Sequence, residues 1–332
     1  MFLHSVAVQD QLISADAIQT FDLAVNPLSV VLIALRPLND TGTLANMQSY
    51  KGLCAALNRA TVLYRGEAIK SARGEDIAAL NYFRWGIMPY QGQHDDTNDE
   101  RRCAVLPIIM GRWPFDPKSC FPAVHRGELQ LELDMDIADT GYDGLRLSVE
   151  TIELLDAKPT EYEKWVQVAQ TNAATGDADV DLAATGNLIR GILLFGTTPF
   201  AGATPAPSWG RVKVLLDNQE HGFGSADFEV LQMLHSLWGR QPPAYDGHMH
   251  RVTTSGCAQT ALATISGPFN VGGGIAGAVD INSWMQYAFM DFDPTGDDRH
   301  AMATQGKSSL KLRANFETAD LVRAIPIEVI KV

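Results

Sequence analysis

The sequence is short of basic residues. It holds 26 Lys and Arg against 39 Asp and Glu, so its formal net charge is −13, and no basic cluster stands out. Proteins that grip a nucleic-acid backbone usually present a basic patch, because each neutralised phosphate releases counterions. The composition therefore argues against direct nucleic-acid binding, and the acidity favours solubility of a crowded protein.

Long apolar runs and processing signals are also missing. The longest apolar stretch, residues 28–35, is interrupted by Ser29, whereas a membrane-spanning helix needs roughly 20 apolar residues. Residues 1–14 lack the basic start and the small-residue cleavage site of a signal peptide. We therefore expect neither a membrane-spanning helix nor a signal peptide.

Cysteine is sparse and irregularly spaced, with no Cys-x-x-Cys pair. This pattern favours buried free thiols over disulfides or zinc ligands. Free thiols fit a protein that assembles in a reducing cytoplasm. The four residues are Cys54, Cys103, Cys120 and Cys257.

Common catalytic motifs are missing as well. No serine lies in a Gly-x-Ser-x-Gly context, and Gly272-Gly273-Gly274 is not followed by the Lys-Ser/Thr of a phosphate loop. We therefore assign no catalytic residue and interpret the chain as a protein that is not an enzyme.

What the sequence does contain is an internal repeat. The 332 residues, 46% of them apolar, are enough for two domains, and four matches recur in the same order in both halves. In the first match, residues 21–24 (Phe-Asp-Leu-Ala) and the apolar run after them resemble residues 180–183 (Val-Asp-Leu-Ala) and the run after those. The offset is 181 − 22 = 159.

The second match pairs two helical patterns. Residues 62–64 precede a helix expected from Asp76 to Trp85, and residues 214–216 precede one expected from Asp227 to Trp238. Apolar residues recur at helical spacing in both, an acidic residue begins each helix, and a glycine follows each. The offsets are 227 − 76 = 151 and 238 − 85 = 153.

The third and fourth matches are strands near the end of each half. Apolar and polar residues alternate over 129–137 and again over 310–316, which predicts strands with one face on a core. Further strands follow at 145–154 and 325–330. The turn between the first two strands, residues 139–144, favours a closing hairpin. The residues expected in the core are Leu129, Leu131, Leu133, Met135, Leu310, Leu312 and Phe316, with Glu132 and Lys311 facing outward or an interface.

These patterns predict a mainly β chain of two tandem antiparallel jelly-roll (β-sandwich) domains, each with a short helix. Long connections between strands are typical of Greek-key or jelly-roll wiring. We place the first jelly roll at residues 1–157 and the second at 158–332, because Ala157-Lys158-Pro159 breaks the pattern.

The second half carries the longer connection before its last strands. Residues 239–308 number 70, against 42 for residues 86–127, and long loops are usually functional or disordered. Trp284, Tyr287, Phe289 and the apolar stretch 275–279 argue against disorder. We expect this loop, including residues 272–279, to pack against a neighbouring subunit around a threefold axis.

The arrangement resembles the double jelly-roll major capsid proteins of tailless icosahedral viruses, such as corticovirus-like and tectivirus-like phages. The two helices, residues 111–116 and 120–123 (Gly-Arg-Trp-Pro-Phe-Asp and Cys-Phe-Pro-Ala), and residues 191–195 carry the resemblance. It implies a coat protein that self-assembles as pseudo-hexagonal homotrimers into an icosahedral shell, in a virion assembled in the host cytoplasm. Other virion proteins and an internal membrane are further partners under this interpretation. The family transfers no catalytic residues.

One acidic segment is a candidate calcium site. Asp291, Asp293 and Asp297 place carboxylates at alternate positions around Gly296, which resembles the start of a calcium loop. The residue twelfth from Asp291 is Met302, where an EF-hand needs glutamate. An acidic solvated turn is the competing interpretation, and we expect no other cofactor.

Two functional alternatives stay open at this point. His248 and His250 form a His-x-His pair of the kind that binds metal in cupins, so a two-cupin metalloenzyme is the second hypothesis. No glutamate follows closely, and solvated loop histidines are the simpler interpretation. A carbohydrate-binding β-sandwich protein is the third hypothesis, although Trp85 and Trp238, at equivalent repeat positions, suit packing better than sugar binding.

Overall fold

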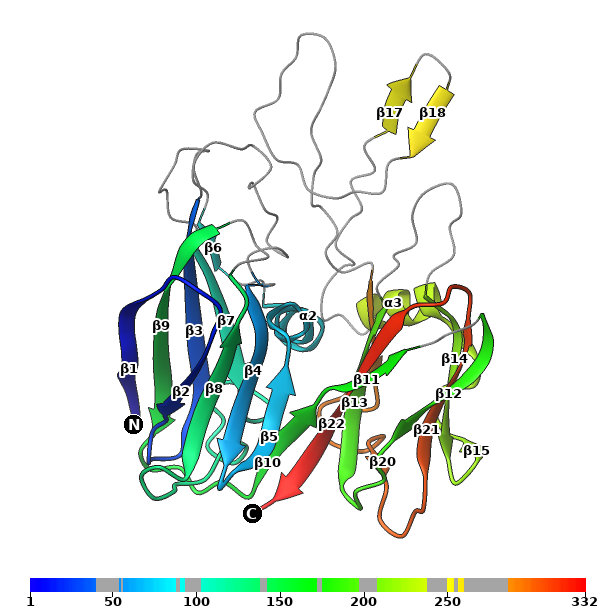
Figure 1. The fold of residues 1–332 in the computed structure, drawn as a ribbon. Coiled ribbons are helices and arrows are strands. Elements are labelled where there is room, and N and C mark those ends of the chain that lie inside the picture. The colour runs from blue at the N-terminus through cyan, green and yellow to red at the C-terminus, as the bar shows by residue number, and fades with distance from the viewer. Residues whose placement is uncertain are drawn as a thin grey trace. The chain divides into compact units, whose positions relative to one another are not determined.

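A computed structural model shows two compact units built mainly of β strands (Figure 1). The structure describes residues 1–39, 54, 56–87, 90–92, 103–137, 142–171, 175–196, 208–237, 250–253, 256–259 and 286–332. The first unit comprises Met1–Val166 with Ile330–Val332, and the second comprises the described residues from Gln167 to Val329.

The first unit is a sandwich of two sheets. One sheet has the order β1-β9-β3-β7-β6, and the other has the order β10-β5-β4-β8-β2. Their bounds are β1 (Phe2–Ile13), β2 (Ala17–Asp22), β3 (Leu28–Asn39), β4 (Leu57–Tyr64), β5 (Glu67–Ala72), β6 (Tyr90–Gly92), β7 (Cys103–Ile109), β8 (Leu129–Met135), β9 (Tyr142–Leu154) and β10 (Glu161–Val166).

The second unit repeats this arrangement. One sheet contains β11, β22, β13 and β19 in that order, and the other contains β12, β21, β14 and β15. The short strands β20 and β16 add to β13 and β14, and β17 pairs with β18. Their bounds are β11 (Val168–Thr171), β12 (Gly176–Leu182), β13 (Leu188–Gly196), β14 (Trp209–Leu216), β15 (Gln219–Glu220), β16 (Ala226–Asp227), β17 (His250–Thr253), β18 (Gly256–Gln259), β19 (Tyr287–Asp291), β20 (Met302–Ala303), β21 (Leu310–Phe316) and β22 (Leu321–Lys331).

Both units have the same wiring. In the first unit the eight main strands, taken in chain order, are β1 to β5 and β7 to β9; in the second they are β11 to β15, β19, β21 and β22. Numbering these strands one to eight, neighbouring strands in one sheet of each unit follow the order 1-8-3-6, and those in the other sheet follow the order 2-7-4-5. That order defines a jelly roll, in which two Greek keys fold over each other. The expected pair of tandem jelly rolls is confirmed.

The two units also repeat the register in which their strands pair. In the first unit Leu131 lies between Phe21 and Val62 in neighbouring strands. In the second unit Leu312 lies between Val180 and Val214. Each residue pairs as its counterpart does, so the matched sequence positions are matched structural positions.

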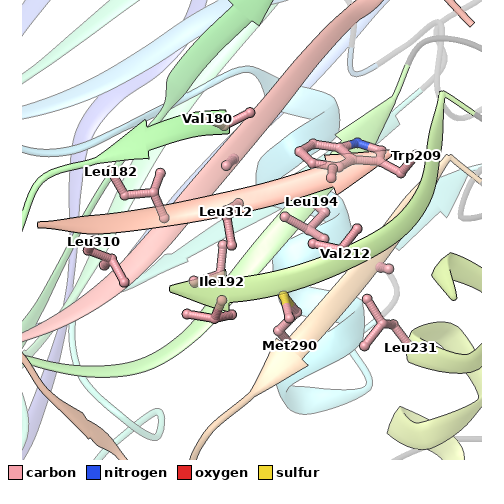
Figure 2. Packing of buried hydrophobic residues seen from close by; sticks show 14 of the residues in the cluster. Val180, Leu182, Ile192, Leu194, Trp209, Val212, Leu231, Met290, Leu310 and Leu312 are labelled. Carbon is pink, nitrogen blue, oxygen red and sulfur yellow. The ribbon is translucent and has the colours of Figure 1, made fainter. Parts of the chain in front are cut away.

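The alternating strands bury the face that the sequence predicts. Strands β8 and β21 bury every second residue, and the seven apolar residues expected in the core are each 0–1% exposed. Glu132 and Lys311 face away and are half-buried. Figure 2 shows the corresponding core of the second unit, where Trp209 and Leu312 pack among residues from both sheets.

One helix lies between the fifth and sixth main strands of each unit, as expected. Helix α2 spans Gly74–Trp85 and ends at Gly86, whose φ of 65° is left-handed and whose N–H caps the carbonyl of Tyr82. Helix α3 spans Phe228–Leu237. Trp238, the expected end of α3, lies outside the described residues.

The expected closing hairpins are wrong. Strand β8 pairs with β2 and β4, whereas β9 pairs with β1 and β3, so the two consecutive strands lie in opposite sheets. Strands β21 and β22 differ in the same way. Turn residues and alternation predict where a strand ends and which face is buried, but they do not say whether the chain returns to the same sheet.

The long connection in the second half is only partly a loop. Tyr287 and Phe289 belong to β19 and are 1% and 2% exposed, so the idea that they form an exposed patch is wrong. Residues 272–279 and Trp284 lie outside the described residues, and their contact with a neighbouring subunit stays a prediction.

Two other sequence expectations meet the structure in part. Cys54, Cys103 and Cys120 carry free thiols, and the side chain of Cys257 lies outside the described part. Among the described residues, no helix is long and apolar enough to cross a membrane. The boundary at residue 157 stays a prediction; strand β10, beyond it, lies in the first compact unit.

Candidate assembly surfaces and buried charges

The three aspartates of the expected calcium site have different surroundings. Asp291 and Asp293 are buried at the end of β19, and Arg190 of β13 lies beside them. The Arg190 guanidinium holds Asp298 through two hydrogen bonds of 2.7 and 3.0 Å and lies 3.9 Å from Asp293. A cation of the protein itself therefore already neutralises this acidic turn.

Asp297 has other partners. It is exposed, accepts a hydrogen bond from Thr295, and pairs with Arg299 at 3.2 Å. These bonds hold the pKa of Asp297 below its usual range. No three His, Cys, Asp or Glu side chains in the described residues are grouped to hold a metal ion, and the calcium site stays a prediction.

The His-x-His pair falls almost entirely outside the described residues. His248 is not described, and of His250 only the backbone in β17 is described. The structure therefore does not test the cupin hypothesis at these two side chains.

Strand β10 is attached to the first unit by a buried ion pair. Glu163, which is fully buried, accepts two hydrogen bonds from the Arg84 guanidinium of α2. Trp165 follows two residues later on the same face and lies opposite Lys70 of β5 in a parallel pairing. The strand is thus joined to both the helix and the sheet edge.

Lys70 is the unusual member of this cluster. Its ammonium lies 4.7 Å from the ring centre of Trp165 and has no hydrogen-bond partner among the described residues. Burial lowers the pKa of Lys70 to about 7; the charge of Arg84 acts in the same direction and that of Glu163 against it. A buried lysine is tolerated here because it loses its charge easily and rests on an aromatic face.

Sequence reasoning missed this cluster. The available signal was the segment Glu161-Tyr162-Glu163-Lys164-Trp165, in which glutamate and tryptophan alternate as on a strand. Arg84 is 79 residues from Glu163, and Lys70 is 95 residues from Trp165 (165 − 70), so no local pattern connects these partners to the segment.

The free edge of the first unit is a candidate assembly surface. Among the described strands, β1 pairs with β9 alone, and its apolar side chains Phe2, Leu3 and Val6 are 61%, 42% and 51% exposed. The Phe2 ring also packs edge-on against Phe115 at 5.8 Å beside a shallow hollow of about 350 Å³. Edge strands are usually protected by charges, proline or bulges. Residues 2–9 contain no Asp, Glu, Lys, Arg or proline, but the register against β9 shifts between Val6 and Val8 and again between Val8 and Gln11.

A second exposed apolar surface lies on the second unit. Helix α3 buries Phe228 and Leu231 in the core but leaves Val230 and Met233 47% and 52% exposed. These two residues are three positions apart and therefore share one face of the helix. Apolar surfaces of this kind usually mark contacts with another protein.

Comparison with known proteins supports the fold. No family model matches the chain, and no curated protein matches its sequence. Among solved structures, the major capsid protein of bacteriophage PM2 covers 100% of this chain with 98% of its own length, at 10% identity and a TM-score of 0.61. The chain has the double jelly-roll fold.

Two further capsid structures share this double jelly roll. The major capsid protein of Sulfolobus turreted icosahedral virus aligns over 100% of this chain and 97% of its own, with a TM-score of 0.67 and 10% identity. A chain of the PBCV-1 virus capsid aligns over 99% and 93%, with a TM-score of 0.59 and 9% identity. The similarity therefore extends over both units.

Proposed function

We propose that this chain is a viral major capsid protein, which self-assembles as homotrimers into an icosahedral shell. One observation carries the proposal: two jelly rolls with the same wiring make up the chain, and this whole arrangement covers nearly all of several capsid proteins. Function then rests on shape and on the surfaces that join copies rather than on a catalytic centre.

The proposal assigns the protein to the virion. Other copies of the same chain are its main partners, other virion proteins and an underlying membrane are further partners, and assembly takes place in the host cytoplasm. The net charge of −13 makes the chain a poor ligand for nucleic acid, so the genome would be enclosed without direct contact.

Electron microscopy of the native source material tests the proposal. A regular lattice whose repeating unit accommodates three copies of the chain is the expected result. Light scattering of the purified protein should give a mass of three chains. A single chain at high concentration, with no ordered lattice under any condition, would contradict the capsid function.

The cupin alternative makes a different prediction. Replacing both His248 and His250 with alanine should leave folding and assembly unchanged if the chain is a coat protein. A stoichiometric transition metal in the purified protein that disappears in the double variant would instead establish the metalloenzyme.

The carbohydrate-binding alternative predicts retention on immobilised glycans. Trp85, one of its candidate contacts, donates its indole N–H to the carbonyl of Arg112 at 2.7 Å, and its ring lies 4.5 Å from the guanidinium of Arg84. These contacts favour a packing role, so we expect no retention.

A further inference from the structure

The first strands of the two repeats differ in their neighbouring strands. Adding the repeat offset of 159 to β1 (2 + 159 = 161 and 13 + 159 = 172) gives residues 161–172, which contain β10 and β11. Strand β10 pairs in parallel with β5, and its Glu163 and Trp165 are buried. Strand β1, its counterpart, has no neighbouring strand on that side in the part of the chain that the structure describes.

The strand edge that binds β10, which is the edge of β5, also has an equivalent in the second repeat. An offset of 214 − 62 = 152 takes β5 to residues 219–224, which begin with β15. In β5, Ile69, Lys70 and Ser71 are at most 5% exposed, whereas Gln219 and Glu220 of β15 are exposed. Among the described residues, this contact is formed once, between β10 and β5, while the equivalent edges β1 and β15 each lack a strand on that side.

The helices beside these edges show the same contrast. Helix α2, which holds β10 through Arg84, is buried along most of its length. Helix α3 leaves Val230 and Met233 exposed. The second repeat thus exposes both the β15 edge and an apolar face of α3.

We propose that β1 of one copy pairs with the β15 edge and the exposed face of α3 of a neighbouring copy, so that the β5–β10 contact within each chain recurs between chains. The proposal rests on the assembly proposed above and names the surfaces that would produce it. Such a contact joins two different surfaces, so it is heterologous and can close a ring of three chains.

The chemistry of both surfaces fits a second copy as the occupant. Phe2, Leu3 and Val6 offer apolar side chains to Val230 and Met233 of the neighbour. Residues 2–9 carry no Asp, Glu, Lys or Arg, so they add no negative charge opposite the exposed Glu220 of the neighbour. The outer backbone groups of β1 can form such a pairing as well, because β9 is its one strand neighbour within the described residues.

The internal contact also predicts the register. Within the chain, Trp165 lies opposite Lys70, and Val166 lies opposite Ser71. Applying the offsets (166 − 159 = 7 and 71 + 152 = 223) places Ala7 of one copy opposite Phe223 of the next. Ala7 is exposed, so replacing it leaves the core intact, whereas Phe223 is half-buried and its ring packs against Phe292 at 5.3 Å, so Phe223→Cys removes one contact at the margin of the core.

Cysteine cross-linking tests this register. Oxidation of the double variant Ala7→Cys, Phe223→Cys should give covalent trimers that reduction returns to single chains. Each single variant alone should give none, and a mixture of the two singles should give covalent dimers. The oxidised wild type controls for the native cysteines. Cross-linking of Ala7→Cys with itself would mean that two β1 strands pair symmetrically and would overturn the proposal.

Charge substitutions provide an independent readout. Val6→Glu and Met233→Glu should each reduce the mass in solution from three chains to one. Ile18→Glu, at an exposed position on β2, is the matched control and should leave the mass unchanged. If Val6→Glu retains the wild-type mass and lattice, the β1 edge is not the contact, although the capsid function stands. A wild type that never associates would overturn both.

Discussion

Helices α2 and α3 occupy the same place in the two jelly rolls but differ in how far they are buried. Helix α2 is enclosed, so each polar side chain that it buries needs a partner: Asn81 donates to the carbonyl of Pro107 at 2.7 Å, and Arg84 binds Glu163. Helix α3 is amphipathic, with Leu231 inside and Val230 outside. The comparison teaches that wiring and register survived the divergence of the repeats, whereas the outer surfaces were free to change.

The largest expected effect comes from breaking the buried pair of the first unit. Glu163→Ala leaves the buried Arg84 without its carboxylate and should lower the free energy of unfolding by about 3–5 kcal/mol. In the second unit, Asp179→Ala removes the partner of Arg313 (2.7 and 2.9 Å) at an exposed site and should cost less than about 1 kcal/mol. Urea unfolding of both variants measures the difference; equal losses would show that β10 is not held by this pair.

Matched core truncations should have a slightly smaller effect and should be alike. Leu131→Ala and Leu312→Ala remove equivalent side chains, each 0% exposed, and should each cost about 2–5 kcal/mol. Chemical denaturation provides the measurement. A cost near zero for either variant would contradict its place in a packed core, and a large difference between them would show that the two cores do not tolerate cavities equally.

Lys70 should make the free energy of unfolding of the first unit depend on pH. The second unit has Gly222 at the matched position and should lack this contribution. Folded Lys70 loses its proton near pH 7, whereas an unfolded lysine keeps it up to about pH 10.5. The unfolded chain therefore binds one more proton between these values, and the contribution of Lys70 to stability rises by about 1.4 kcal/mol per pH unit. The variant Lys70→Met should remove this slope in unfolding experiments from pH 7 to 10; an unchanged slope would contradict the assignment.

The smallest effect is expected from calcium. Because Arg190 already neutralises the turn that contains Asp293 and Asp298, added calcium should leave the thermal midpoint unchanged, both in the wild type and in Asp297→Asn. A midpoint that rises with calcium in the wild type but not in Asp297→Asn would establish the ion site.

Much of the fold was predictable because it is local and repeated. Alternation over residues 129–137 predicts a strand and its buried face, and glycines at the helix ends predict where the helices stop. Which strand pairs with which is set by packing over the whole unit, so the crossing from β8 to β9 between sheets could not be inferred from the turn.

The candidate surfaces were harder to predict. Exposure of Val230 and Met233, and burial of Tyr287, depend on which neighbouring elements cover them. The link between Glu163 and Arg84 joins residues 79 positions apart. Charge spacing showed the aspartates around residue 293, but it did not reveal Arg190, which reaches them from β13.

The central place of the last strand has a consequence for how each unit folds. Strand β9 lies between β1 and β3, and Phe2 pairs with Leu154 at the far end of the unit. Strand β3 can pair with β7 earlier, but the β9 side of both β1 and β3 stays open until residues 142–154 arrive. The slow, non-local closure expected of sandwiches, on the order of milliseconds to seconds, therefore applies. During that time both strands are open edges that another incomplete chain could occupy. Production of the protein is therefore limited by how many unfinished chains are present together, and slower synthesis or a lower temperature should raise the yield of soluble protein.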